Sequence, residues 1–354
     1  MVIPGTIAVV LAGGIGSRFW PASRPDRPKQ LLPLAGEAPL IVDTVRRAER
    51  LVGAPNVRLL TGADLVEPFR SVLPDYPMER FWVEPVPRST GPALAWAAHR
   101  IAGEDPNGVM ISLHADHLIR PFEAFAATVE RAVRAARERR CLVCVGIRPD
   151  RAETGYGYVE LGEEAAPGVH AVRRFVEKPD AETAATYVAS GRHLWNTGIF
   201  VWRAADLLDA VRGLSPEMGA ALPALEPGGD GVEAFFDRVE PVSVDVGVLE
   251  RAANVEVAVG EFTWDDVGTW GALARSREPD EAGNVASGDV ALVEAYDNIV
   301  WSEDGRVVLF GVDDLVVVRS GDEVLVTRRD LAADLKRALA GIEEAEELET
   351  EGST

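Results

Sequence analysis

The chain has 354 residues, of which 47% are hydrophobic and 26% are charged. These fractions match ordinary globular domains and exclude a fibrous or wholly disordered protein. At roughly 100 to 200 residues per domain, the length indicates one large domain with an appendage, or two domains. The formal net charge of −21 opposes attraction to phosphate backbones and anionic membranes, so we expect neither a nucleic-acid partner nor a membrane partner.

The N-terminal apolar stretch, residues 7–12, is too short for a signal-peptide core and follows no basic residue. We therefore expect a buried strand in a cytoplasmic protein. No apolar run in the sequence approaches the ~20 residues of a membrane-spanning helix. At the other end, residues 341–354 contain six glutamates and no lysine or arginine, which predicts a solvated acidic tail.

From residue 7 to about 147, short apolar or β-branched runs alternate with amphipathic segments. We expect strands over residues 7–11, 57–61, 80–84, 109–113 and 142–147, and helices over residues 40–51, 63–73, 92–102 and 122–139. Strict alternation of strand and helix is typical of a doubly wound parallel α/β sheet, whose ligand sites lie at the carboxyl ends of the strands.

After residue 150 the pattern becomes mixed. We expect strands over residues 156–161, 169–176 and 198–202, a helix over 181–190, and a mostly helical stretch over 204–251 that a loop at 226–231 interrupts. Short strands follow at residues 290–292, 298–301, 307–310, 315–319 and 323–326, before a last helix at 331–340. Because the composition shifts near residues 278–283, we expect domains at residues 1–282 and 283–340, followed by the tail at 341–354.

Cys141 and Cys144 form a CxxC pattern, which is found at redox and metal sites. They lie in an apolar run, residues 141–147, that is typical of a buried strand, where positions three apart point to opposite faces. Neither a second CxxC nor a nearby histidine completes a zinc set. We therefore expect two core thiols.

The strongest motif is a glycine-rich loop, Leu-Ala-Gly-Gly-Ile-Gly-Ser-Arg, at residues 11–18. Such a loop after a strand brings backbone N–H groups close to phosphates. It is neither a Walker A loop nor a dinucleotide fingerprint, because it lacks Gly-Lys-Ser/Thr and the last fingerprint glycine. Only three of the 36 basic residues are lysines, Lys29, Lys178 and Lys336. Lys29 lies eleven residues after Arg18, which favours a phosphate-binding loop over a simple tight turn.

His114, Asp116 and His117 follow the strand expected at residues 109–113. A carboxylate at the carboxyl end of a parallel strand is well placed to hold Mg²⁺ beside a nucleotide. The two histidines also allow a transition-metal site, but they lack the i, i+4 spacing of a zinc helix and no third ligand is evident. We favour Mg²⁺ at Asp116 and leave a hydrogen-bonded structural role open for both histidines.

Further polar segments lie in apolar surroundings. Glu177 and Lys178 connect a strand to a helix, where they can bind sugar hydroxyls and a phosphate or form a surface ion pair. Asn196 and Thr197 offer amide and hydroxyl partners for a polyol. The adjacent aspartates at residues 265–266 can complete a metal site or cap a turn or helix.

In this order, these segments resemble the sugar-1-phosphate nucleotidylyltransferases, and most closely the mannose-1-phosphate guanylyltransferases. The resemblance runs from about residue 6 to residue 340. Its most specific part is the glycine loop with Arg-Pro-Lys-Gln at residues 27–30; Glu-Lys-Pro at 177–179, Trp-Asn-Thr-Gly at 195–198 and Trp-Asp-Asp-Val-Gly-Thr-Trp at 264–270 are jointly strong. The resemblance implies a Rossmann-like nucleotidyltransferase domain with a mixed central sheet, followed by a small left-handed β-helix-like domain and a terminal helix often used for dimerisation.

The resemblance also implies roles for particular residues. The nucleotide-binding set is Leu11, Gly13, Gly14, Gly16, Ser17, Arg18, Lys29, Arg88, Thr90 and Gly91, of which the last three border the base. The sugar-binding set is Tyr156, Gly157, Glu177, Lys178, Asn196 and Thr197, with Lys178 as the partner of the sugar phosphate. The metal-binding aspartates are Asp116 and Asp266, and the residues expected to serve catalysis are Arg18, Lys29, Asp116 and Lys178. Relatives usually have Pro-Ala/Ser-Asp-His where this chain has His-Ala-Asp-His at residues 114–117, which leaves the role of His114 open.

The implied reaction is in-line attack of mannose 1-phosphate on the α-phosphorus of GTP, assisted by Mg²⁺ or another divalent cation and forming GDP-mannose and pyrophosphate. The resemblance leads us to expect a homodimer. We also expect transferase activity alone, because longer relatives carry a fused phosphomannose isomerase domain for which this chain leaves no room. One alternative is the same chemistry on another hexose or heptose 1-phosphate or another nucleotide. Another is a noncatalytic regulator that binds GDP-mannose, although such a protein would be expected to lose an acid or a lysine of these motifs.

Overall fold

The computed structural model describes residues 2–14, 16–225 and 231–341, and its packing divides them into two compact units. The sheet unit takes the described residues up to Gly13, together with Asp43–Ala115 and Ile119–Trp264. The coil unit takes Gly14–Val42, Asp116–Leu118 and the described residues from Asp265 onwards. Of the acidic tail expected at residues 341–354, all but the first residue lies outside the described residues.

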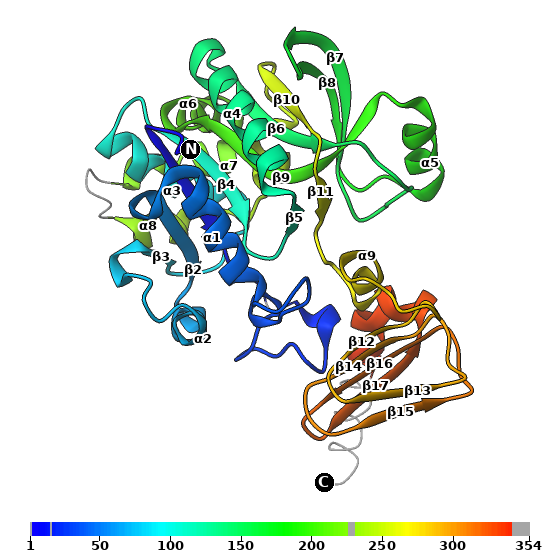
Figure 1. Ribbon diagram of the computed structural model, residues 1–354. Coiled ribbons are helices and arrows are strands. Elements are labelled where there is room, and N and C mark those ends of the chain that lie inside the picture. Colours follow the sequence, from blue (N-terminus) through cyan, green and yellow to red (C-terminus); the bar gives the residue numbers. More distant parts are fainter. Residues whose placement is uncertain (1, 15, 226–230, 342–354) are drawn as a thin grey trace. The chain divides into compact units, whose positions relative to one another are not determined.

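A nine-stranded mixed sheet forms the centre of the sheet unit, with the strand order β3-β2-β1-β4-β9-β6-β10-β8-β7 (Figure 1). The first four strands pair in parallel, as the strict alternation predicts, whereas β9 runs antiparallel to both β4 and β6. The expected mixed α/β architecture is therefore confirmed. The strands are β1 (Thr6–Leu11), β2 (Val57–Gly62), β3 (Phe81–Glu84), β4 (Val109–His114), β6 (Leu142–Ile147), β7 (Tyr158–Ala166), β8 (Val169–Val176), β9 (His193–Arg203) and β10 (Val255–Gly260).

Helices cover this sheet and bury its apolar residues. Helix α4 packs against β6, β9 and β10, and α3 packs on α6. The core includes Trp82, Trp96 and Phe236, whose rings meet in tilted and edge-to-face pairs. The helices are α1 (Leu40–Val52), α2 (Val66–Val72), α3 (Thr90–Glu104), α4 (Phe122–Arg139), α5 (Ala181–Ser190), α6 (Ala204–Leu214), α7 (Pro216–Gly219), α8 (Val232–Arg238) and α9 (Leu273–Ser276), the last of these in the coil unit.

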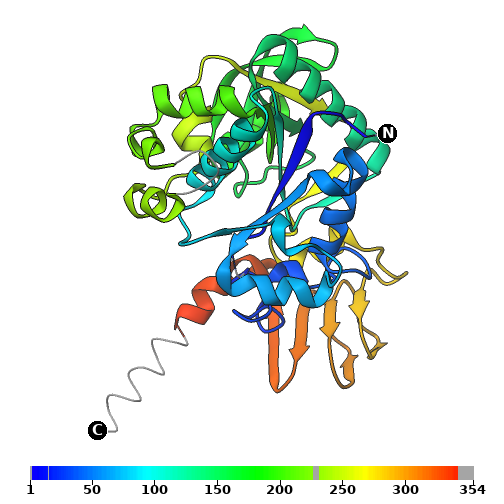
Figure 2. The same ribbon diagram turned by 90° about the vertical axis from the view of Figure 1, so that its left-hand side faces the viewer.

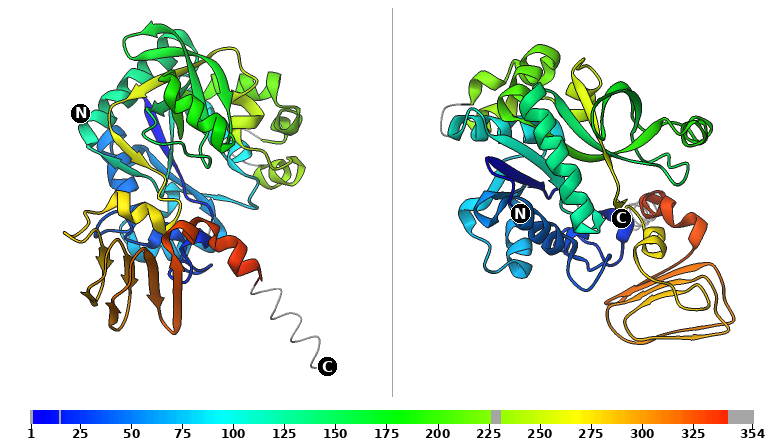
Figure 3. Two further views of the ribbon diagram at one scale, coloured as in Figure 1. Left: turned by 90° about the vertical axis from the view of Figure 1, so that its right-hand side faces the viewer. Right: turned by 45° about the horizontal axis from the view of Figure 1, so that its top comes forward.

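Short strands of the coil unit form successive turns of a coil, seen side by side in Figure 2 and nearly end-on in the right-hand view of Figure 3. Parallel partners lie 14 residues apart in one pair (Val285 and Ile299) and 17 in the next (Ile299 and Val316), so each turn of chain stacks on the one before. The strands are β12 (Val285–Ser287), β13 (Val290–Val293), β14 (Ile299–Ser302), β15 (Val307–Phe310), β16 (Leu315–Ser320) and β17 (Glu323–Arg328). A 3₁₀ segment, Arg329–Asp334, and helical residues 335–341 follow.

The loop after β1 belongs to the coil unit because its apolar residues pack there. Phe19 lies edge-to-face on Trp270 with ring centroids 5.0 Å apart, and the Arg277 guanidinium donates hydrogen bonds to the carbonyls of Leu34 and Gly36. Residues 265–282, which we assigned to the first domain, pack in this unit as well. The domain division at residue 282 stays a prediction.

Four of the described strands were not expected from the sequence. They are β10 and β12, together with β5 (Leu118–Arg120) and β11 (Thr263–Asp265), which form a two-stranded sheet. Cys141 and Cys144 are buried free thiols, as expected, and burial raises the pKa of Cys144 to about 12. Within the described residues, the structure has no helix that is long and apolar enough to cross a membrane.

Candidate active site

The glycines of the candidate phosphate-binding loop differ in the space around them and in backbone conformation. Leu11 ends β1, and a Cβ added to Gly13 or Gly14 would meet no atom of the described residues within 4 Å. Gly16 has a φ of 72° and lies so close to the Lys29 stem that a Cβ there would collide with it. Glycine is therefore required at position 16, both by the left-handed backbone and by the approach of Lys29.

Lys29 joins three segments of the coil unit. Its side chain is buried, and its Nζ lies 3.0 Å from Oδ2 of Asp116 and 2.7 Å from the carbonyl oxygen of Asp266. The same ammonium lies 5.7 Å from the centre of the Phe19 ring, within the range of a cation–π contact. A compact ammonium with three donors suits this arrangement better than a planar guanidinium would. One predicted catalytic lysine thus brings together the segments of both predicted metal-binding aspartates.

Ser17 and Arg18 lie in a 3₁₀ turn, Ser17–Phe19 (η1), and are exposed. Within the described part of residues 11–30, the ion pairs are made by Arg24, Arg27 and Lys29 and not by Arg18. The Arg18 guanidinium is therefore accessible for a ligand with negative charge.

The two adjacent aspartates have different surroundings. Asp265 is buried; it accepts hydrogen bonds from the Arg275 guanidinium at 2.7 Å and from the Val267 N–H at 2.8 Å. From the sequence, the two aspartates could bind a metal or cap a turn. The partners of Asp265 show that its carboxylate stabilises the turn. Asp266 contributes its carbonyl oxygen to Lys29 and is less buried, which supports the choice of Asp266 as the metal-binding candidate.

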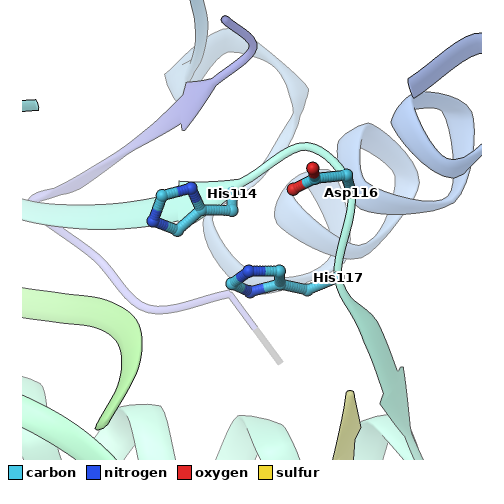
Figure 4. Close-up of side chains that lie close together, drawn as sticks. All are labelled: His114, Asp116 and His117. Atoms are coloured by element: carbon cyan, nitrogen blue, oxygen red, sulfur yellow. The ribbon is translucent and has the colours of Figure 1, made fainter. Parts of the chain in front are cut away.

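Figure 4 shows His114, Asp116 and His117 extending to the same side of the turn after β4. One potential ligand atom from each lies within 4.8 Å of the others. The pairing of Asp116 with an ammonium shows that its carboxylate attracts a cation, and a carboxylate is a ligand that Mg²⁺ accepts. With two imidazoles the set also suits a transition metal. The donor chemistry fits a divalent cation, and its identity stays a prediction.

Most of the predicted sugar-binding residues meet around the start of β7 and the middle of β9. A Cβ added to Gly157 would collide with Oε2 of Glu177 and lie 3.3 Å from the Asn196 side chain. Tyr156 packs edge-to-face against Trp195 and Trp264. Because no side chain at position 157 separates them, Glu177 and Asn196 can approach each other.

Lys178 and Thr197 differ strongly in accessibility. Lys178 is exposed, and its Nζ lies 3.2 Å from Oε1 of Glu177. Thr197 is 1% exposed, and its hydroxyl donates to the Val145 carbonyl at 2.7 Å. The Thr197 hydroxyl thus already has a partner within the sheet, and its role toward a sugar stays a prediction.

The three residues predicted to border the base contact the chain between residues 236 and 244. Arg88 donates from Nε to the Phe236 carbonyl, and the Thr90 hydroxyl accepts the Val244 N–H at 3.1 Å. The Gly91 N–H donates to the Val242 carbonyl at 3.0 Å, and a Cβ at Gly91 would lie 2.6 Å from that oxygen. These contacts fix the start of α3; contact with a base stays a prediction.

Two acidic residues, Glu84 and Asp245, were not among the site residues predicted from the sequence. Burial raises the pKa of Glu84, at the end of β3, to about 7. Burial and the negative charge of Glu177 raise the pKa of Asp245 to about 6. The signal for Asp245 in the sequence is weak, because it is a single acid inside the apolar run 244–249. Perturbed carboxyl groups of this kind are common at functional sites.

Comparison with known proteins is consistent with this geometry. The Nucleotidyl transferase family model matches residues 7–282, and a MannoseP isomerase/GMP-like beta-helix domain matches residues 288–340. The chain therefore belongs to the nucleotidyl transferase family, and it is a nucleotidyltransferase enzyme with a β-helix-like C-terminal domain.

Individual relatives have more specific names. A mannose-1-phosphate guanylyltransferase of Escherichia coli (strain K12) is 37% identical over 351 residues, which cover 94% of this chain and 73% of the relative. A protein of the same name from Salmonella muenchen is 34% identical, with 94% and 72% covered. A crystal structure described as mannose-1-phosphate geranyltransferase from Thermus thermophilus superposes with a TM-score of 0.87 at 34% identity, covering 96% of this chain and 99% of that one.

Proposed function

We propose that this enzyme transfers the guanylyl group of GTP to mannose 1-phosphate, forming GDP-mannose and releasing pyrophosphate. The names of the relatives support this pair of substrates. The contact of Lys29 with both Asp116 and the Asp266 carbonyl supports it most directly. Because of this contact, a buried positive charge and two acidic segments lie next to the glycine loop. Nucleotidyl transfer requires groups of this kind, which position phosphates and neutralise their charge.

In this reaction a phosphate oxygen of mannose 1-phosphate attacks the α-phosphorus of GTP, and the bond to the β-phosphate oxygen breaks. The loop glycines, Ser17 and Arg18 hold the triphosphate by backbone N–H groups and a guanidinium. Lys29 stabilises negative charge on the phosphates, and Lys178 binds the phosphate of the sugar. Such chemistry depends on positioning and charge neutralisation, so the chain needs no nucleophile of its own.

Mg²⁺ is the divalent cation that we propose for this site, with Asp116 and Asp266 as its protein ligands. When bound, it neutralises phosphate charge and lowers the barrier to attack at phosphorus. The donor set at Asp116 supports a divalent cation in general, and the use of triphosphate as substrate favours Mg²⁺.

We propose in addition that the enzyme is a homodimer. An outward row of apolar side chains on β13 and β15 supports this assembly: Val293 is 49% exposed, Val308 60% and Phe310 67%. An exposed apolar row of this kind is commonly covered by a partner.

Pyrophosphate release across a matrix of nucleoside triphosphates and sugar 1-phosphates, with and without Mg²⁺, tests the function. We expect release with GTP and mannose 1-phosphate in the presence of Mg²⁺. Activity with another pair only would replace the substrates and keep the chemistry. Binding of GDP-mannose without turnover of any pair would favour the regulator instead.

A further inference from the structure

Asp245 begins a π-helical turn, Asp245–Leu249 (η7), in the sheet unit. Turns of this type are rare and occur frequently at functional sites. The Oδ1 atom of Asp245 accepts a hydrogen bond from Nδ2 of Asn196, with an N–O distance of 2.8 Å. Asn196 belongs to the predicted sugar-binding set, so an acid outside that set holds one of its members.

The partners of Asn196 define how its carboxamide is turned. Its Nδ2 donates to Asp245, and its Oδ1 accepts the Gly198 N–H at 3.1 Å. A flipped carboxamide would place oxygen against a carboxylate and NH₂ against an N–H group, so both contacts would become repulsive. One N–H of Nδ2 then remains, in a defined direction, for a ligand.

The backbone around Asn196 is irregular in a way that turns this side chain. Between the pairs Cys144–Phe200 and Gly146–Asn196, one residue of β6 faces three residues of β9. Gly198, inside this bulge, has a φ of 69°, and a Cβ there would lie 2.8 Å from Nε2 of His114. Bulges re-aim side chains next to active sites. The bulge of β9 and the π turn thus meet at the hydrogen bond between Asn196 and Asp245.

The residues just before Asp245 are fixed as well. The Val242 carbonyl accepts the Gly91 N–H, and the Val244 N–H donates to the Thr90 hydroxyl. Residues 242–245 are therefore held at one end by the start of α3 and at the other by the Asn196 side chain. This double attachment limits the movement of Asp245 relative to Asn196.

We propose that Asp245 is a positioning residue for the sugar substrate: its carboxylate holds the Asn196 carboxamide in the orientation in which the second N–H of Nδ2 donates a hydrogen bond to the sugar. The inference rests on the proposed function and adds a residue to it. Asp245 acts through Asn196 and does not itself touch the sugar. The negative charges of Glu177 and Glu250 also act on Asp245, so its surroundings disfavour the charged form of the acid.

A double-mutant cycle tests this role with the full-length enzyme. Loss of Asp245 in D245A should raise the KM for mannose 1-phosphate roughly ten- to thirty-fold, because an oriented hydrogen bond to the sugar is lost. The kcat and the KM for GTP should change less than about threefold. The same substitution in an N196A enzyme should produce no further rise in KM, since its target is then absent.

Matched variants separate positioning from folding and from direct contact. D245N keeps a carbonyl acceptor for Asn196 and should restore the KM to within about threefold of the parent. D237A, which removes an exposed acid of α8, should leave all constants unchanged. If D245A does not fold, D245V fills the space without an acceptor and takes its place in the cycle.

Additive effects of D245A and N196A, or an unchanged KM in D245A, would overturn the proposal. Failure of the proposed function would look different, because the parent enzyme itself would then be inactive with GTP and mannose 1-phosphate. In that case the cycle is measured with the sugar 1-phosphate that the parent uses.

Discussion

Lys29 combines burial with an ion pair and a carbonyl contact, which makes its charge hard to replace. Its ammonium contacts Asp116 and the Asp266 carbonyl, and its stem occupies the space that a side chain at Gly16 would need. A buried charge is retained where its partner or ligand requires it, since removing one member of such a pair leaves the other uncompensated.

Replacement of Lys29 by methionine should keep the packing and abolish most of the activity. We expect kcat/KM to fall at least about 100-fold, because phosphate charge is then unbalanced during transfer. Pyrophosphate release measures the effect, and K336M, at an exposed lysine of the C-terminal helical segment, is the control. A K29M/D116N double variant restores neutrality; recovery of activity in it would show that Lys29 acts only by compensating Asp116.

Glu84 should destabilise the folded enzyme as pH rises. Its pKa is raised from 4.5 to about 7 by burial, so the folded chain binds this proton more tightly than the unfolded chain. Its stabilising contribution is complete below about pH 4.5 and is lost as pH rises through 7. E84Q stays neutral and should therefore have a higher free energy of unfolding than the parent at pH 8, by about 1 to 2 kcal/mol after solvent screening.

Unfolding of E84Q and the parent at pH 5 and pH 8 checks this sign. The difference between the two should be much smaller at pH 5, where Glu84 is neutral in the folded chain and has only begun to lose the contribution that is complete below pH 4.5. E79Q, at an exposed glutamate near the start of β3, should show no such difference between the two pH values. A stability gain that is equal at both pH values would argue against titration of Glu84 as the cause.

Sequence motifs marked the segments of the candidate site because polar residues stand out in apolar surroundings, either after a strand, as at Asp116, or within one, as at Asn196. They could not assign every side chain, since hydrogen bonding at a bulge depends on distant residues. Thr197 turns its hydroxyl to Val145, 52 residues away, and Asp245 meets Asn196 across 49 residues. Such partners become visible only when β6, β9 and the π turn are brought together.

At the scale of elements, short apolar or β-branched runs predicted most strands of both units. The short strands β5, β11 and β12 have three residues each, too few for a period to be recognised. The last expected helix begins instead as a 3₁₀ segment at Arg329. Single-sequence patterns are least reliable at such boundaries, because packing of the last turn decides between the two helix types.

Two glycines of the coil separate the effect of a positive φ from the effect of close packing between successive turns. Gly288 has a φ of 93°, and a Cβ there would collide with the Ser302 carbonyl of the next turn. G288A should therefore lower the free energy of unfolding by about 3 kcal/mol or more. Gly311 also has positive φ, 65°, but no atom in the described part of the chain lies within 4 Å of its added Cβ, so G311A should cost only about 1 kcal/mol.

Chemical denaturation of the two variants measures this difference. Equal losses would show that backbone conformation, rather than the stacking of successive turns, limits these positions. A larger loss in G288A would confirm that the carbonyl of Ser302 occupies the space in solution.

At the scale of the whole molecule, the net charge of −21 and a pair of anionic substrates have the same sign. Long-range fields act over about 10 Å at moderate salt, so they repel these substrates from the bulk surface. In the proposed reaction, binding would then come from local donors such as the loop N–H groups and Lys29, and from the divalent cation proposed at Asp116. An acidic enzyme can in this way bind phosphates at one place while its surface rejects polyanions.

The proposed homodimer makes a prediction at this scale. In the parallel pair of β13 and β15, Val293 lies opposite Phe310 and Ala291 lies opposite Val308, while Leu309 is buried on the other side. The outward row is therefore continuous across both strands. Two charges placed in it would be buried without partners in a dimer, which costs several kcal/mol.

A V308D/F310D variant should accordingly elute with the mass of one chain, 38.1 kDa, whereas the parent should show twice that mass by light scattering. V324D/V326D is the matched control, because these valines of β17 are 56% and 61% exposed but lie in the other sheet of the coil. It should remain dimeric. A parent that is already monomeric would overturn the homodimer. A control that dissociates while V308D/F310D does not would move the interface away from β13 and β15.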